Sequence, residues 1–261
     1  MDDSLARTQD GMDAPADGDR RPGPLAGRAA LVTGGAQGLA CLCRDLSGAR
    51  AIVIVGDVRE GRTQEPAQSV RAKGFSVEER ALDVGDPASA ATAFEDTVAR
   101  QDHCDILVNK AGKDITVSVE QRPINEWQGI IGVNPTGRCL AAKAVFPHMR
   151  RQGAGHIVNI VSTAAKRAWP NASAHHARKW GLLGLSHAPH VEARPLNIKV
   201  TTVISRKLRT PFLPDRSPDI DQSTLQYPAN VARTVRLMLS QPAETVSPEI
   251  MVLPMRESSW P

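Results

Sequence analysis

The sequence predicts an α/β fold in three layers, built on a doubly wound, mostly parallel sheet of about seven strands. From residue 29 onward, short β-branched and aliphatic runs alternate with longer helical patterns. These runs are apolar throughout instead of alternating with polar residues, as expected for strands that are covered on both faces. Such alternation also implies right-handed crossovers between parallel strands.

The expected strands are, in chain order, 29–33, 51–55, 75–82, 105–108, 156–161, 198–204 and 249–253. The expected helices are 38–47, 62–73, 87–101, 124–151, 173–193 and 229–240. The third helix has a clear start, because Asp86 is a good N-cap and Pro87 suits the first turn. Pro135 and Pro189 fall inside expected helices, where each would cost about 3 kcal/mol unless a kink accommodates it.

The chain of 261 residues is long enough for one large α/β domain, which we expect over residues 26–255. Residues 1–25 are polar and lack the basic start and apolar middle of a signal peptide, so we expect a disordered N-terminal extension. Residues 256–261 form a C-terminal tail. The irregular stretch 205–226 is rich in Pro, Asp and Arg and has the length of a substrate loop.

Composition excludes several classes of function. Aromatic residues make up only 3%, which argues against a nucleic-acid surface that stacks bases, and the net charge of +4 is spread without a basic block. No apolar run approaches the roughly 20 residues that span a membrane. The four cysteines show no CxxC pair or zinc spacing, so we expect no metal site. Free thiols favour a cytoplasmic protein.

A glycine-rich turn follows the first expected strand and opens the first expected helix. There, Gly34 and Gly38 would let the backbone approach a pyrophosphate that rests on the helix N-terminus. The alternative is an ordinary strand–helix turn. Asp57 ends the second strand 23 residues after Gly34, where a carboxylate can accept hydrogen bonds from a ribose diol and repel a 2′-phosphate. This favours NAD as cofactor, while Arg59 and Arg62 leave NADP open.

Residues 33–40 resemble the T-G-x-x-x-G-x-G signature of the short-chain dehydrogenase/reductase family, with Ala40 in place of the last glycine. The residues after the third strand resemble the family's adenine-contacting pair. Those after the fourth resemble its N-N-A-G motif, with Lys110 replacing the second asparagine. The resemblance covers about residues 26–255 and implies a three-layer Rossmann fold. It implies these cofactor-binding residues: Thr33, Gly34, Gln37, Gly38, Leu39, Asp57, Asp83, Val84, Asn109, Ala111, Gly112 and Lys179.

In that family an asparagine, a serine, a tyrosine and a lysine form the catalytic site. Asn134, Ser162 and Lys179 match three of these positions. His175 stands at the tyrosine position, thirteen residues after Ser162 and four before Lys179. The resemblance implies that Ser162 binds the substrate oxygen, Lys179 the nicotinamide ribose and Asn134 a relay water. His175 would stand where the proton donor belongs.

Replacing tyrosine by His175 raises two physical problems. A histidine ring nitrogen lies roughly 2 Å nearer its backbone than a tyrosine hydroxyl, and misplacement of about 1 Å can cost about 100-fold in rate. A nearby Lys179 cation would also disfavour imidazolium. His176 should point elsewhere, because neighbours on a helix differ in direction by about 100°. Tyr227, the single tyrosine, could take over only if the 205–226 loop placed it at the site.

Two hypotheses follow. The first is an NAD(P)-dependent oxidoreductase that interconverts a small-molecule alcohol and a ketone or aldehyde by hydride transfer. The second is a catalytically impaired relative that binds nucleotide or partner subunits without turnover. A methyltransferase on a related sheet would leave the serine and the lysine unexplained. The resemblance also implies a homodimer or homotetramer. The second hypothesis is motivated by departures from the family pattern at Ala40, Lys110, His175, Ser205 and Arg206.

Overall fold

The computed structural model describes residues 23–35, 40–58, 64–72, 74–112, 117–210 and 220–256. Within these ranges one parallel sheet has the strand order β3-β2-β1-β4-β5-β6-β7. The chain starts at β1 and builds outward in both directions, which makes the sheet doubly wound. The predicted fold class is therefore confirmed. The strands are β1 (Ala29–Thr33), β2 (Ile52–Asp57), β3 (Val77–Ala81), β4 (Ile106–Asn109), β5 (Gly155–Ser162), β6 (Ile198–Ser205) and β7 (Glu249–Val252).

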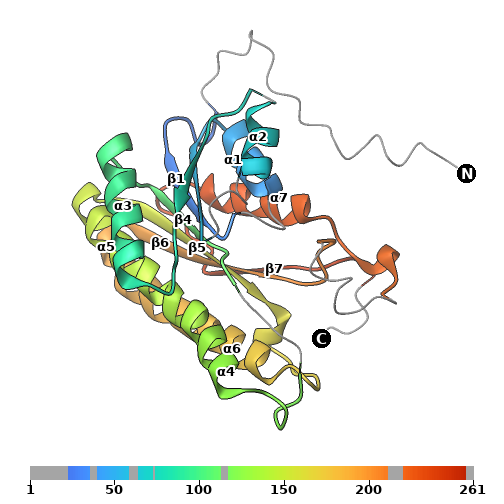
Figure 1. Cartoon of the computed structure of the whole chain (residues 1–261). Coiled ribbons are helices and arrows are strands. Elements are labelled where there is room, and N and C mark those ends of the chain that lie inside the picture. The colour runs from blue at the N-terminus through green and yellow to red at the C-terminus, as the bar shows by residue number, and fades with distance from the viewer. Residues whose placement is uncertain are drawn as a thin grey trace, which may run out of the picture.

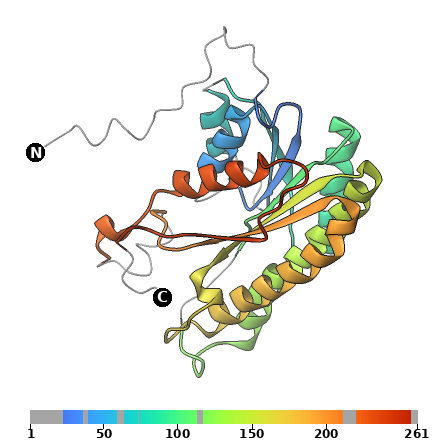
Figure 2. The ribbon, with the colours of Figure 1, turned by 180° about the vertical axis from the view of Figure 1, so that it is seen from behind.

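Helices cover both faces of the sheet (Figures 1 and 2). On one face lie α1 (Ala40–Gly48), α2 (Gln64–Arg71) and α7 (Pro228–Leu239). On the other lie α3 (Pro87–Gln101), α4 (Ile124–Ile131), α5 (Gly137–Gln152) and α6 (Ser173–Ala193). Leu46 of α1 and Val235 of α7 belong to one buried cluster, and Phe94 of α3 and Val145 of α5 to another. No described helix is both long and apolar enough to cross a bilayer.

The expected strands and helices lie within a few residues of the observed ones, with one exception. The single helix expected at 124–151 is wrong, because η2 (Gly132–Thr136) separates α4 from α5. There Asn134 leaves the helical region, with φ −157° and ψ 114°. Proline disfavours helical conformation in the residue before it, and Pro135 follows directly. By contrast, α6 continues through Pro189.

The folded part begins slightly earlier than expected. Of the predicted extension 1–25, the structure describes only residues 23–25. Leu25 is fully buried in the core, and its N–H donates to the carbonyl of Ala49 at 3.1 Å. An apolar side chain without exposed surface contributes to hydrophobic stabilisation, so Leu25 belongs to the folded domain.

The described ends of the predicted 205–226 loop are held together beside the sheet. Leu208 pairs with Gln226 in an isolated bridge. The Gln226 Nε2 group donates to the carbonyls of Arg206 and Val252, both at 2.9 Å. The loop therefore leaves and rejoins the domain at the carboxyl ends of β6 and β7. In sheets of this kind ligands bind at that edge.

Candidate active site

Asn134 lies in the break between α4 and α5 with none of its surface exposed. Neither its Nδ2 nor its Oδ1 has a hydrogen-bond partner among the described residues. A Cβ added to Gly112 would lie 3.9 Å from Asn134 Nδ2, so the amide is beside the segment that follows β4. Leaving a buried polar group unpartnered costs about 1–3 kcal/mol and calls for an explanation such as a bound water. The broken helix therefore presents an amide suited to holding a water or ligand.

Helix α6 is attached to the chain on both sides of Ser162. The Ser162 Oγ, at the end of β5, accepts the N–H of Ala164 at 3.2 Å. The Lys179 Nζ donates to the carbonyl of Ile160 at 3.2 Å, and the His176 Nδ1 lies 3.0 Å from the carbonyl of Ala164. These contacts bring the first two turns of α6 to the end of β5. Ser162, Lys179 and His176, the neighbour of the predicted His175, therefore lie at one edge of the sheet.

The two neighbouring histidines have different partners. The His175 Nδ1 lies 3.0 Å from Nη2 of Arg178, one turn further along α6. The His176 Nε2 accepts the backbone N–H of Trp169 at 3.1 Å, and its ring meets the Trp169 ring edge-on at 4.3 Å. The two rings therefore leave the helix in different directions, as the helical geometry predicts.

Arg178 is a cation in contact with His175 that the sequence analysis, which considered Lys179, did not identify. Arg178 is buried, with 4% of its surface exposed. It also reaches the segment after β4, since a Cβ on Gly112 would lie 3.2 Å from Arg178 Nη1. The Lys179 ammonium instead donates to the β5 backbone. Positions i and i+3 on a helix are neighbours, which explains why Arg178 can reach the His175 ring.

Arg138 on α5 was missed by sequence reasoning. The residue is 1% exposed, and its guanidinium donates to the carbonyls of Asn109, at the end of β4, and Ala111, just after it. Burial lowers the pKa of Arg138 to about 9, and the charge of Arg178 acts in the same direction. The signal was present in the sequence, because Arg138 continues the helical spacing of the apolar residues Ala141, Val145 and Met149.

The ends of β1 and β4 approach each other closely. The Thr33 Oγ1 accepts the backbone N–H groups of Lys110 and Ala111 at 3.1 and 3.2 Å. Gly34 follows with φ +68°, and a Cβ there would lie 2.5 Å from the Cα of Ala111. Only glycine fits both the left-handed backbone and this approach. The predicted cofactor residues at these two strand ends therefore form one close-packed cradle.

A methyl group at position 34 should destabilise the fold. We expect Gly34→Ala to lower the free energy of unfolding by about 1–3 kcal/mol more than Gly153→Ala. Gly153 has the same φ of +68° but nothing within 4 Å of its Cβ position, so it controls for the backbone strain alone. Urea unfolding of both variants measures the difference. Equal losses would contradict the steric argument.

The residues predicted to bind the adenosine half of the cofactor differ in their burial and in their contacts. Asp57 is half-buried at the end of β2. Asp83 is exposed, and its Oδ1 accepts the N–H of Gly85 at 2.8 Å. The Val84 side chain packs in the core. Three predicted residues lie outside the described part of the chain: Gln37, Gly38 and Leu39.

The side chains of Asn109, at the end of β4, and Lys110, which follows it, each donate a hydrogen bond to another segment of the chain. The Asn109 Nδ2 donates to Asn159 Oδ1 at 2.9 Å, and Asn159 Nδ2 donates to Ser186 Oγ at 2.9 Å. This chain of amides links β4 through β5 to α6. The Lys110 ammonium donates to the carbonyl of Gly34. Burial lowers its pKa to about 8. Both side chains therefore help to hold the cradle together.

Tyr227 has a different partner from the residues of the candidate site. Its hydroxyl accepts a hydrogen bond from Arg209 Nη1 at 2.8 Å, and that guanidinium lies 4.7 Å from the centre of its ring. The described contacts of Tyr227 therefore do not support a role in place of His175.

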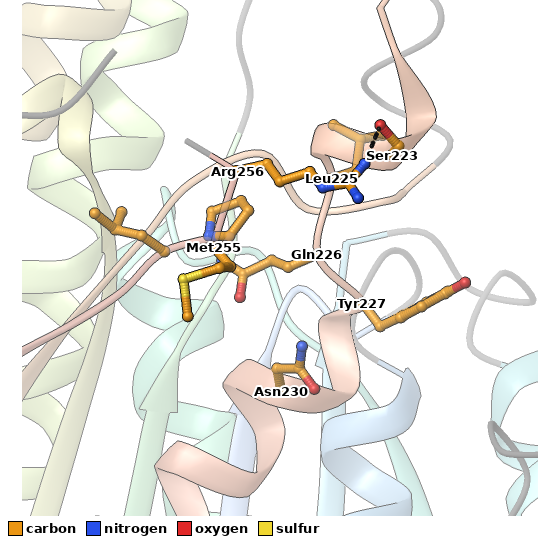
Figure 3. A pocket seen from close by; sticks show the side chains of 9 residues that line it. Ser223, Leu225, Gln226, Tyr227, Asn230, Met255 and Arg256 are labelled. Atoms are coloured by element: carbon orange, nitrogen blue, oxygen red, sulfur yellow. Dashed lines mark hydrogen bonds between the residues drawn. The ribbon is translucent and has the colours of Figure 1, made fainter. Parts of the chain in front are cut away.

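Within the described ranges, no group of three or more His, Cys, Asp or Glu side chains could hold a metal ion. Tyr227 lines a pocket of about 270 Å³ (Figure 3) with Ser223, Leu225, Gln226, Asn230, Leu253, Pro254, Met255 and Arg256.

Known proteins resemble this chain over most of its length. Residues 28–221 match the family model described as short chain dehydrogenase. The trans-4-hydroxycyclohexanecarboxylate dehydrogenase of Sinomonas cyclohexanicum is 33% identical over 195 residues, which are 72% of this chain and 75% of that protein. The 2-dehydro-3-deoxy-L-rhamnonate dehydrogenase (NAD(+)) of Sphingomonas sp. (strain SKA58) is 34% identical over 207 residues, 78% of this chain and 80% of that protein.

The structural comparison agrees with the sequence comparison. A solved metagenomic short-chain oxidoreductase in complex with NADP has a TM-score of 0.79 and 27% identity, and the match covers 89% of this chain and 99% of that one. The segment matched by the family model contains every candidate site residue from Thr33 to Lys179. The match to the family model therefore covers β1 to β6, the cradle and the segment from Ser162 to Lys179.

Proposed function

The chain belongs to the short chain dehydrogenase family, and we propose that it interconverts an alcohol and a ketone or aldehyde by hydride transfer with NAD(H) or NADP(H). The observation that supports this proposal is the attachment of α6 around Ser162, through Lys179 and through His176, the neighbour of His175. Similar proteins are named dehydrogenases, one of them with NAD(+), and a similar structure holds NADP.

The described residues fit a dinucleotide at the strand ends. Gly34 lets the ends of β1 and β4 pack together without a side chain between them, and Asp57 at the end of β2 provides a carboxylate for a ribose. Lys179 would hold the second ribose. When bound, the nicotinamide would supply or accept the hydride. The chain's own residues would bind and orient the substrate and move the proton.

Each catalytic candidate has a role that its contacts permit. The Ser162 Oγ accepts the Ala164 N–H, which leaves its own O–H to donate to a substrate oxygen. The buried amide of Asn134, which has no hydrogen-bond partner in the described ranges, would hold a relay water. His175 would act as the proton donor at the position where the family has tyrosine. These roles, and the substitution of histidine for the catalytic tyrosine, are part of the proposal.

We also propose that NAD is the preferred cofactor. The Asp57 carboxylate should repel the 2′-phosphate of NADP, so NADH is expected to bind at least about 10-fold more tightly than NADPH. Asp57→Ser should reduce that preference. Isothermal titration calorimetry with both nucleotides measures it, and Asp96→Ser, an exposed change on α3, is the matched control. Tighter binding of NADPH by the wild type would contradict the assignment.

The second candidate function is nucleotide binding without turnover. It is favoured by two buried guanidinium groups, Arg138 and Arg178, next to the segments that carry Asn134 and Gly112. Nucleotide titration followed by assays on a broad panel of alcohols, ketones and aldehydes separates the two functions. Turnover supports the oxidoreductase. Tight NADH binding without turnover supports the second function, and absence of both contradicts each.

The state of assembly and the cellular location are further parts of the proposal. We propose a homodimer or homotetramer, on the resemblance to the family alone. A cytoplasmic location is proposed because the described cysteines are free. Light scattering after size exclusion measures the assembly, and a monomer at micromolar concentration would contradict it.

A further inference from the structure

We propose that Arg178 keeps the proton of His175 on Nε2, so that His175 donates to the substrate oxygen as a neutral imidazole and becomes an imidazolate. The catalytic half of this inference rests on the proposed function. The position of the proton does not, because it follows from contacts within α6. Arg178 is thus a positioning residue that acts through His175.

The proton position follows from the chemistry of the two partners. The Nη2 of Arg178 lies 3.0 Å from Nδ1 of His175. A guanidinium has N–H donors and no acceptor, so Nδ1 must accept this hydrogen bond. A neutral imidazole carries one N–H, which therefore lies on Nε2. Arg178 is 4% exposed, and a buried charge-assisted hydrogen bond is stronger than one in water.

The next residue offers an internal contrast. The backbone N–H of Trp169 donates to Nε2 of His176 at 3.1 Å, so this nitrogen must accept. The proton of His176 therefore lies on Nδ1, from which it donates to the carbonyl of Ala164 at 3.0 Å. Two consecutive histidines are thus expected to carry their protons on opposite nitrogens.

The positive charges near the His175 ring disfavour the uptake of a second proton and favour the loss of the first. A second proton on His175 would add a cation beside Arg178 and remove the acceptor of its hydrogen bond. Loss of the Nε2 proton creates an anion that the same positive charges stabilise. Two cations in the described part of the chain lie near the ring: Arg178 donates to it, and Arg206 lies over the ring of Trp169, whose centre is 5.9 Å from that of His175. Further away, Lys166 after β5 is ion-paired with Glu249 of β7, and Glu192 lies near the C-terminal end of α6.

The proposed step is balanced without a further reactant. In carbonyl reduction, the Nε2–H bond of His175 breaks and its proton goes to the substrate oxygen. The ring keeps the electron pair as an imidazolate beside Arg178. The carbonyl carbon gains a hydride whose source is the reduced nicotinamide of the proposed function, and the carbonyl π pair moves to oxygen. Alcohol oxidation reverses these changes and therefore needs the imidazolate as base.

Nitrogen-15 NMR of the full chain with labelled histidine tests the proton position directly. It needs neither cofactor nor substrate. We expect an Nε2–H signal for His175 and an Nδ1–H signal for His176 near pH 7.5. His175→Gln and His176→Gln each remove one of the seven sets of histidine signals, and so assign the two residues. A His175 proton on Nδ1, or on both nitrogens, would overturn the inference.

Variants of Arg178 test the cause. Arg178→Met should give a mixture of His175 tautomers and uptake of a second proton at higher pH than in the wild type. Arg178→Lys keeps a cationic donor and should restore the Nε2–H form at least in part. Arg194→Met removes an exposed charge just beyond the C-terminal end of α6, about 28 Å from His175 by the rise of the helix, and should change nothing. An Nε2–H form that persists in Arg178→Met contradicts the role of Arg178. If that variant fails to fold by circular dichroism, the wild-type and Arg178→Lys spectra decide.

The pH dependence of alcohol oxidation tests the catalytic half. With imidazolate as the base, kcat/KM of the wild type should rise about tenfold per pH unit from about pH 6 to 9.5 without a plateau. Arg178→Met should reach a plateau above neutral pH, because an ordinary imidazole becomes the base. A plateau in the wild type contradicts the step. A protein with the Nε2–H signal but no turnover contradicts the proposed function and leaves the proton position standing.

Discussion

His175→Tyr should increase kcat/KM for carbonyl reduction by about 100-fold or more. The phenol oxygen would reach roughly 2 Å further from the backbone than the imidazole nitrogen, and misplacement of about 1 Å already costs about 100-fold. A phenol, with an ordinary pKa near 10, also loses a proton far more readily than a neutral imidazole. The ammonium of Lys179 is held at the end of β5, one turn further along α6, where it can stabilise a phenolate.

The neighbouring histidine supplies the matched control for this gain. His176→Tyr introduces the same side chain one position away, but it removes the contacts of the ring with Trp169 and Ala164. It should give no increase. Steady-state assays of both variants with NADH and a carbonyl panel measure the difference. If His175→Tyr gives no gain while NADH still binds, the proposed role of position 175 is contradicted.

Acidification from pH 6.5 to 4.5 should lower the free energy of unfolding by about 2–3 kcal/mol through one buried side chain, His156. His156 on β5 is 3% exposed, and its Nε2 lies 2.9 Å from Thr201 Oγ1. Burial lowers its pKa to about 3, with smaller contributions from Arg28 and Lys199. The folded ring therefore stays neutral while the unfolded ring takes up a proton below its ordinary value. The stability is present above pH 6.5 and is lost as the pH falls towards 3.

A variant isolates this contribution from that of the carboxylates. Urea unfolding at pH 6.5 and 4.5 is compared between the wild type and His156→Gln, whose amide can still hydrogen-bond to Thr201. The variant should lose about 2–3 kcal/mol less than the wild type over this range. His187→Gln changes an exposed histidine and should follow the wild type. Equal losses in all three proteins would contradict the assignment to His156.

The elements that could be predicted are those coded by local patterns. Apolar runs located the strands, and Asp86 with Pro87 located the start of α3, which is observed at Pro87. Pro135 signalled a break in the helix expected at 124–151, but not its form. A break that places the Asn134 amide beside the segment after β4 depends on packing against β4 and α6, which lie at a distance from residue 134 in the sequence.

Some features of the candidate site could likewise be predicted from local sequence patterns, and others depended on tertiary packing. The fold class, the glycine turn at Gly34 and the spacing from Ser162 to Lys179 follow from the sequence, because strand ends and helical turns are set by nearby residues. Three-dimensional packing was needed to identify Arg178 as the partner of His175, to bury Arg138 beside it and to turn Val84 into the core. Side-chain direction depends on which distant segments close around a helix, and no local pattern specifies that.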